Sequence, residues 1–216
     1  MPPVKSSRSY VSPLRQKQAE QTRLAVIGAA RELFIAQGYG ATSVTAIARH
    51  AGVSPDTVYA VFGTKAGLLK QVIDVTIAGD TDQTPLPERQ SAQAIRAEPD
   101  GRRCLQIYAA DATQRLTMAG PVLTALRTAA ASAPDVAAQL AESDRQRLTG
   151  MTMLAAELAG KEHINADADT IRDLLWLTAS AECWDLFCRR RGWSQQHWES
   201  WAAATWQAAL TDDPKP

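Results

Sequence analysis

The 216-residue sequence has few of the residues on which enzyme or metal chemistry depends. Its histidines are too far apart to suggest a ligand cluster, and its cysteines show no CxxC spacing: His50, His163, His197, Cys104, Cys183 and Cys188. It also lacks a phosphate-binding glycine loop, a serine nucleophile elbow and an HExxH pattern. We therefore expect a protein that is not an enzyme and that holds no cofactor and no metal. An odd number of cysteines without a secretory signal is typical of the reducing cytoplasm.

Long hydrophobic runs and strand-like alternation are scarce as well. No stretch approaches the roughly 18 consecutive apolar residues that cross a bilayer, and the N-terminus has no apolar segment of the kind found in signal peptides. Alanine is abundant, and proline and glycine separate segments of helical periodicity. The sequence therefore predicts a cytoplasmic, all-α protein without a membrane partner.

The formal net charge is zero, but the two signs are unevenly distributed along the chain. Residues 1–70 contain nine lysines and arginines against three acidic residues, a balance of +6, so the remainder carries −6. A basic half can neutralise DNA phosphates, whereas an acidic half is repelled by them. The alternative is a basic face that contacts only solvent.

Residues 42–69 show the spacing and the capping residues of a helix-turn-helix. A first short helix has its apolar residues three and four positions apart, and Thr42 or Ser43 can cap it. Gly52 ends this helix because glycine adopts the left-handed conformation without strain, and Ser54-Pro55 starts the next one. A further helix follows from Thr64. With an amphipathic helix over residues 23–37, these elements predict a three-helix DNA-binding domain over residues 20–80, after a disordered basic tail over residues 1–19.

The second helix of this motif exposes its N-terminal residues. Such residues reach base edges when the helix lies in the major groove of DNA. Pro55, Asp56 and Thr57 are therefore the candidates for base contacts. Asp56 can accept a hydrogen bond from a cytosine amino group, but its charge cannot approach phosphates favourably.

A specific combination of residues extends over this region: Ala30, Phe34, Gly38, Ile47, Ala48, Ala51, Gly52, Val53, Ser54, Thr57, Tyr59, Phe62, Lys65, Leu68 and Leu69. It resembles the N-terminal domain of the tetracycline-repressor (TetR) family of bacterial transcriptional regulators, although Asp56 stands where that family often has a small or neutral residue. The resemblance implies that Tyr59 and Lys65 hold phosphates, with Ser43 or Thr45 binding phosphate from the other side. The full set expected to face DNA is Thr42, Ser43, Thr45, Ser54, Pro55, Asp56, Thr57, Tyr59 and Lys65. Alternatively, Tyr59 is a core tyrosine and Lys65 is a plain surface lysine.

Residues 81–216 are numerous enough for a second helical core. Breaks at proline and glycine predict helices near residues 102–117, 121–131, 135–159, 167–191 and 195–210. The resemblance implies that this part is an effector-binding and dimerisation domain.

All six tryptophans lie between residues 176 and 206. In the last predicted helix, three of them share a wide face with small residues, and the preceding helix is apolar on most of its circumference. We expect these faces to be buried against a second copy of the chain, as the family's C-terminal helices imply. The interface would contain Trp184, Trp198, Trp201, Ala202, Trp206 and Ala209. Alternatively, the tryptophans fill the protomer's own core.

The leading hypothesis is a homodimeric, ligand-responsive repressor that binds a palindromic operator in double-stranded DNA. By the resemblance, an unknown small-molecule effector would bind in an apolar pocket on the mid-chain helices. Its candidate residues, which can equally be ordinary core, are Tyr108, Met118, Leu123, Leu126, Met151, Leu154, Trp176 and Cys183. Two alternatives remain open: a DNA-binding regulator without a small-molecule effector, and a helical enzyme that carries a reader domain.

Overall fold

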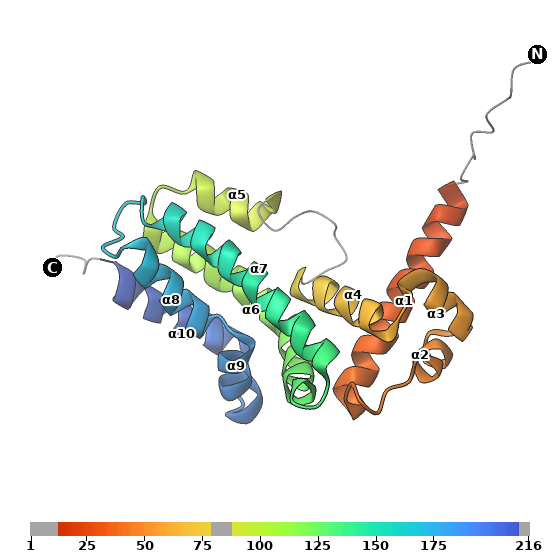
Figure 1. Cartoon of the computed structure of the whole chain (residues 1–216). Helices are drawn as coiled ribbons and strands as arrows, with labels where there is room; N and C mark the ends of the chain where they lie inside the picture. The colour runs from red at the N-terminus through yellow and green to blue at the C-terminus, as the bar shows by residue number, and fades with distance from the viewer. Residues whose placement is uncertain (1–12, 79–87, 212–216) are drawn as a thin grey trace, which may run out of the picture.

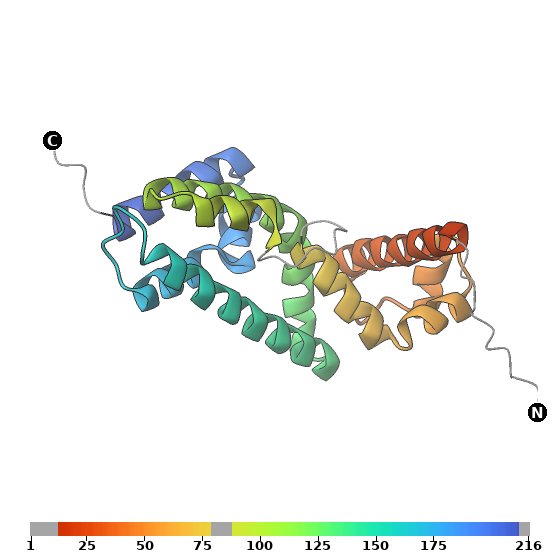
Figure 2. The same cartoon turned by 90° about the horizontal axis from the view of Figure 1, so that it is seen from above.

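The computed structural model describes residues 13–78 and 88–211, which form two helical lobes (Figures 1 and 2). The first lobe contains α1 (Pro13–Gln37), α2 (Val44–Ala51), α3 (Pro55–Phe62) and α4 (Lys65–Ala78). The second contains α5 (Gln90–Ala97), α6 (Gly101–Ala130), α7 (Pro134–Leu158), α8 (Ala168–Thr178), α9 (Ala181–Trp184), the π-helical turn η2 (Asp185–Arg190) and α10 (Gln195–Leu210). No β-strand occurs in the described ranges, and the all-α prediction is confirmed. The domain boundary expected at residue 80 lies outside them.

The two lobes meet along α4, α6 and α7. Helix α4 packs against both α6 and α7, and α1 also contacts α6. Figure 1 shows α4 leading from the first lobe toward the two long helices of the second. Within the described part of the chain, no helix is long and apolar enough to cross a bilayer.

The core of the first lobe comes from the apolar residues that the helical periodicity singled out. Phe34 on α1, Ile47 on α2, Val58 on α3 and Leu68 on α4 are all buried. Helices as short as α2 and α3 are marginal in isolation, because forming the first turn is costly. Burial of these side chains against one another therefore supplies most of their stability.

Helix α1 starts earlier than the sequence indicated. It begins at Pro13, so residues 13–19, which were expected to be disordered, are helical. A proline is tolerated in the first turn of a helix, where its missing N–H would have had no partner. Further along, Arg23 forms an ion pair with Glu20 (3.0 Å) and donates to Gln71 on α4 (2.8 Å), which ties α1 to the domain. Residues 1–12 of the predicted tail lie outside the described residues.

Helix α6 continues through Pro121, whereas the prediction placed a break at residues 118–120. An internal proline removes one backbone hydrogen bond and can bend a helix without ending it. Tertiary contacts support this segment. The Met118 carbonyl accepts a hydrogen bond from Arg31 of α1 (2.8 Å), and Gly120 lies directly against Trp184.

The predicted helix over residues 167–191 is interrupted at Ala179 and Ser180. Ala179 leaves the helical region (φ −88°, ψ 37°), and the Ser180 hydroxyl caps α9 by accepting a hydrogen bond from the Cys183 N–H (3.1 Å). Serine competes well for such backbone groups, so it favours a new helix start over continuation. The single long helix was therefore a wrong prediction.

The predicted dimer interface is wrong for four of its residues, because they fill the protomer's own core. Trp184, Trp198, Ala202 and Trp206 are at most 4% exposed in the single chain, so they have no surface left for a partner. The Trp198 ring lies 5.1 Å from that of Trp184 and 6.3 Å from that of Trp206, centroid to centroid. The indole N–H of Trp206 donates to the Thr178 hydroxyl of α8 (2.7 Å).

The two other residues of that set keep some exposed surface. Trp201 is half-buried against Phe187 and Trp193. Ala209 is exposed. Their place in an interface stays a prediction.

Candidate DNA-binding surface and ligand cavity

The turn between α2 and α3 has the geometry that its residues predicted. Gly52 lies in the left-handed region (φ 71°, ψ 29°), and its N–H donates to the carbonyls of Ala48 and Arg49. The Ser54 hydroxyl accepts a hydrogen bond from the Thr57 N–H (3.2 Å), and Pro55 occupies the first turn of α3. Because each of these contacts is local, the start of α3 is set within one residue.

The N-terminal turn of α3 presents its polar residues to solvent. Asp56 is exposed, Pro55 and Thr57 are half-buried, and Val58 on the opposite side is buried. The hydroxyls of Ser54 and Thr57 lie 2.9 Å apart and share a hydrogen bond. Ser54 therefore holds the orientation of Thr57 as well as capping the helix.

Thr42 does not belong to the DNA-facing set, and this prediction was wrong. Its side chain is 1% exposed, and its hydroxyl donates to the Gly38 carbonyl (2.7 Å), which closes the turn after α1. The hydroxyl of Ser43 caps α2 instead, accepting from the Ala46 N–H (3.1 Å). Ser43 and Thr45 are both exposed.

The two residues expected to bind phosphate differ in their surroundings. Tyr59 is 51% exposed, so the alternative of a core tyrosine is wrong. Lys65 is not a plain surface lysine: its ammonium donates to the Tyr39 carbonyl (2.6 Å) and lies 3.9 Å from the centroid of the Tyr39 ring. Burial lowers the pKa of Lys65, while Asp135 opposes that shift. The ammonium has further N–H donors. The contact with Tyr39 therefore orients Lys65 and leaves donors available for a phosphate.

Tyr39 joins the DNA-binding lobe to the second lobe. Its hydroxyl donates a hydrogen bond to Oδ2 of Asp135, in the first turn of α7. Burial and this carboxylate raise the pKa of Tyr39 well above its usual value, so the phenol stays protonated. The sequence held no signal for this contact, because an acidic residue at a helix N-terminus is explained by the helix dipole alone.

A cavity of about 410 Å³ lies in the second lobe, between α6 and α7. Residues from α4 and α5 line one part of it, and residues from the junction of α8 and α9 line another. Of the predicted pocket residues, Tyr108, Leu123, Met151 and Leu154 line it.

The other four predicted pocket residues are not part of the wall of this cavity. Met118 is 40% exposed at the junction of the lobes, and Leu126 is completely buried in the core. The Trp176 ring packs against the Arg147 guanidinium but is not part of the lining, and Cys183 lies in the single turn of α9. Periodicity identifies a buried face, but it does not distinguish packed core from cavity wall.

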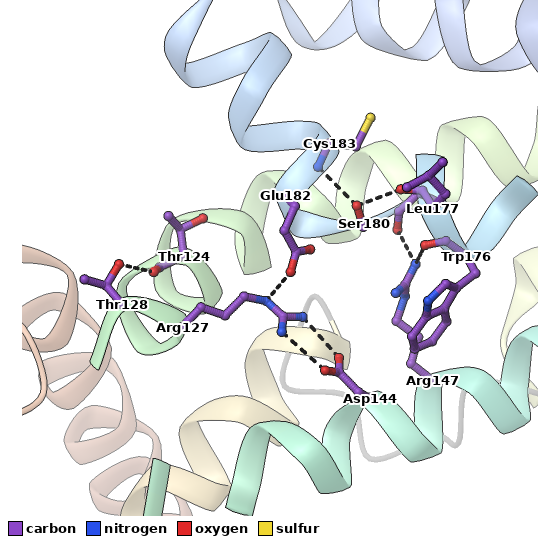
Figure 3. Close-up of polar contacts among 11 residues, drawn as sticks. Thr124, Arg127, Thr128, Asp144, Arg147, Trp176, Leu177, Ser180, Glu182 and Cys183 are labelled. Carbon is purple, nitrogen blue, oxygen red and sulfur yellow. Dashed lines mark hydrogen bonds and ion pairs between the residues drawn. The ribbon is translucent and has the colours of Figure 1, made fainter. Parts of the chain in front are cut away.

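The sequence analysis did not place charged side chains in the cavity lining, where several of them form ion pairs. Asp111 forms an ion pair with Arg115 (2.6 Å) and accepts a hydrogen bond from Ser91 of α5 (2.8 Å). Arg127 pairs with Asp144 of α7 (3.1 Å) and with Glu182 of α9 (2.6 Å). Figure 3 shows the Arg127 guanidinium between these two carboxylates. Arginines and acids on amphipathic helices usually mark the solvent face, so their spacing did not indicate that they line a cavity.

Arg147 also lines the cavity, but its hydrogen bonds go to backbone carbonyls and not to a carboxylate. One of its nitrogens, Nη2, donates to the carbonyls of Trp176 (2.5 Å) and Ala179 (3.1 Å) at the end of α8. Its guanidinium lies over the Trp176 ring, 4.1 Å from the centroid (Figure 3). Burial lowers the pKa of Arg147 from its usual value.

These features together define a class: a helix-turn-helix DNA-binding protein whose second helical lobe contains a cavity of ligand size. Residues 26–72 match the family model described as bacterial regulatory proteins, tetR family. The HTH-type transcriptional repressor BdcR of Escherichia coli (strain K12) is 32% identical over 94 residues, which cover 44% of this chain and 44% of BdcR. The chain thus matches less than half the length of the curated relatives. Over residues 26–72, the chain is therefore similar to the DNA-binding domain of bacterial regulatory proteins of the tetR family.

Solved structures of this kind share the overall fold. NalD of Pseudomonas aeruginosa, the secondary repressor of the MexAB-OprM multidrug efflux pump, has a TM-score of 0.67 at 22% identity, over 92% of this chain and 100% of that one. A transcriptional regulator from Saccharomonospora viridis in complex with choline has a TM-score of 0.65 at 14% identity, over 90% of this chain and 100% of that one. At these identities the similarity concerns the fold alone.

Proposed function

We propose that this protein is a homodimeric, ligand-responsive transcriptional repressor that binds a palindromic operator in double-stranded DNA. The observation that carries this proposal is the exposed N-terminal turn of α3, capped by Ser54 and set by the Gly52 turn. A helix presented in this way enters the major groove with its first residues against the bases. Acting on chromosomal DNA, the protein would work in the bacterial cytoplasm.

The proposed roles divide between reading bases and holding the backbone. Pro55, Asp56 and Thr57 read base edges, and Ser54 positions Thr57 through their shared hydrogen bond. Phosphates are bound by Ser43, Thr45, Tyr59 and Lys65. Phosphate contacts set the register of the domain on DNA but carry no sequence information.

A homodimer would place two copies of α3 in successive half-sites, about 34–36 Å apart or a multiple of this. The outer face of α10 supports this arrangement, because its exposed residues Ser200, Ala204 and Ala208 are small and recur every four positions. Leu177 on the neighbouring α8 is 68% exposed. Small side chains let helix axes approach closely, so we place the interface on this surface, with Trp201 and Ala209 beside it.

Ligand response is supported by the path of α4. Its first residue is Lys65, proposed to hold phosphate, and Ile77 near its end lines the cavity. A ligand that displaces Ile77 would move α4 as a unit and shift Lys65 relative to DNA. Tyr39 and Arg31 connect the lobes at two further points, on Asp135 and on the Met118 carbonyl.

The test is titration of the purified protein onto the DNA upstream of its own gene, at several salt concentrations. Affinity should fall linearly with salt on logarithmic axes, because bound phosphates release counterions. Unrelated DNA of equal length is the control and should bind more weakly. Equal binding to both DNAs, or affinity that ignores salt, would contradict the proposal. Footprinting of the same DNA with and without candidate metabolites tests the ligand response. A footprint that no metabolite weakens would support a regulator without a small-molecule effector.

A further inference from the structure

We propose that the cavity between α6 and α7 binds an apolar molecule that ends in a carboxylate, with Arg147 as the counter-ion. The inference rests on the proposed function only in treating this cavity as the effector site.

The wall of the cavity is suited to an apolar body. Its volume of about 410 Å³ lies within the range usual for small-molecule sites. Aliphatic and thioether side chains make up much of the lining: Ile77, Ile95, Leu116, Leu123, Met151 and Leu154. Unbranched, polarisable methionines adapt to ligands of irregular shape. A flexible hydrocarbon chain therefore fits better than a uniformly polar molecule.

The carboxylates of the lining are already neutralised by neighbours. Asp111 has Arg115 at 2.6 Å, and Asp144 has Arg127 at 3.1 Å. Glu157 has Lys161 at 3.9 Å and a further arginine at 3.8 Å. A cationic ligand would have to compete with these internal partners, so the cavity offers it no vacant carboxylate.

Arg147 lines the same cavity but pairs with no carboxylate among the described residues. Its partners are the carbonyls of Trp176 and Ala179, which accept hydrogen bonds without neutralising the charge. This cap on α8 uses only Nη2, and Nε and Nη1 donate to no group in the described part of the chain. A buried charge is costly unless it is paired, and the pKa of Arg147 is lowered by that burial. Asp144 and Glu182 attract Arg147 without a direct contact, and both are paired with Arg127. An anion at this point would supply a counter-charge in direct contact and accept charge-assisted hydrogen bonds.

Tyr108 offers a second polar contact nearby. It lines the cavity, and its ring lies 5.7 Å from the Arg115 guanidinium. Its hydroxyl donates to the sulfur of Met151 (3.4 Å). A thioether is a weak acceptor, so a ligand carboxylate would readily take over this hydrogen bond.

The experiment compares three probes of equal chain length by isothermal titration calorimetry at pH 7.5: decanoate, decan-1-ol and decylamine. We expect decanoate to bind roughly tenfold to a hundredfold more tightly than decan-1-ol, which is the usual gain from hydrogen bonds to a charged group. Decylamine, protonated at this pH, should bind most weakly.

Variants on α7 assign the preference to one side chain. Arg147→Met should bring decanoate to within about threefold of decan-1-ol, while decan-1-ol itself binds as before and so reports an intact cavity. Arg147→Lys keeps the charge and should keep most of the preference. Arg145→Met is the matched control, because Arg145 is exposed, pairs with Glu142 and does not line the cavity.

Several outcomes would overturn this inference: equal binding of decanoate and decan-1-ol, tightest binding of decylamine, an unchanged preference in Arg147→Met, or no heat from any probe up to its solubility limit. Operator binding by the ligand-free protein is measured separately, by fluorescence anisotropy. If the protein binds its operator but does not bind decanoate, the proposed ligand class is wrong and the proposed function stands. If it binds decanoate but no DNA, the proposed function is wrong and the ligand class stands.

Discussion

Gly120 shows how one missing side chain shapes the second lobe. A Cβ at this position would lie 2.7 Å from Cδ1 of Trp184, closer than real Cβ atoms approach other atoms. Gly120→Ala should therefore lower the free energy of unfolding by about 1–2 kcal/mol, although alanine is the better helix former. Urea denaturation followed by circular dichroism measures this change.

Gly28 in α1 provides the opposite control. Apart from its chain neighbours and the backbone of its own helix, no heavy atom lies within 4 Å of its Cβ position. Gly28→Ala should therefore raise the free energy of unfolding by up to about 1 kcal/mol through helix propensity. Two changes of the same sign would contradict the packing argument, because propensity alone is equal at both sites.

Truncation of Lys65 and truncation of Thr57 should affect DNA binding in different ways. Lys65→Ala should weaken binding to operator and unrelated DNA alike, by about tenfold, and reduce the salt slope by about one, because it removes a proposed phosphate contact. Thr57→Ala should instead change the preference among bases in a panel of operator variants. Identical profiles for the two variants would refute this division.

Lys70→Ala is the control for the lysine, since Lys70 lies on the same helix, is exposed and pairs with Asp74 (2.7 Å). It should leave binding nearly unchanged. Lys65 also packs on the Tyr39 ring, so Lys65→Ala could lower stability as well as DNA affinity. Thermal melting curves of this variant separate the two effects.

Helix α7 is joined to the DNA-binding lobe by the hydrogen bond between Tyr39 and Asp135. A double-mutant cycle with Tyr39→Phe and Asp135→Asn should give a coupling energy of about 1–3 kcal/mol, as expected for a hydrogen bond to a charged acceptor. Urea denaturation of the four proteins provides the values. Tyr59→Phe is the control, because Tyr59 is 51% exposed. Additive effects within about 0.5 kcal/mol would mean that the contact does not couple the lobes.

Helices α6 and α8 illustrate how neighbours decide where a helix ends. Pro121 predicted a break, yet α6 continues because Arg31 and Trp184 support that segment. Ser180 predicted no break, yet the chain turns there and Arg147 caps the freed carbonyls of α8. Local propensity is a weak prior that tertiary contacts override.

Two copies of the protein should associate through the outer face of α10. Ala204→Glu places a charge on an exposed small residue, so it should shift the protein toward monomer without loss of folding, because desolvating an unpaired charge is costly. Operator affinity should fall as well, since a monomer reads only one half-site. Sedimentation velocity at several concentrations measures the first effect.

The control for this variant is Gln196→Glu, on the same helix but in its first turn and exposed. It should leave the sedimentation profile unchanged. A dimer that survives Ala204→Glu would place the interface elsewhere. Trp201→Asp is less informative, because Trp201 also packs against Phe187 and Trp193 within the protomer.

The helix-turn-helix could be predicted from the sequence because the interactions that define it are local. The Ser43 cap, the left-handed Gly52 and the Ser54 cap each join residues no more than four positions apart. The apolar stripes of the first lobe follow the same short period. Such interactions depend little on the rest of the chain, so residue type and spacing were sufficient.

Contacts between residues far apart in the sequence could not be predicted from residue type and spacing. Thr178 and Trp206, Tyr39 and Asp135, and Arg147 and the Trp176 carbonyl are each brought together by helix packing. Whether a tryptophan faces a partner or the core, and whether an arginine faces solvent or a cavity, depends on which helices cover it. The amino-acid sequence thus determined the helix-turn-helix and the helices of the first lobe. Helix packing decided the tryptophan core, the cavity and the position of Arg147 in its lining.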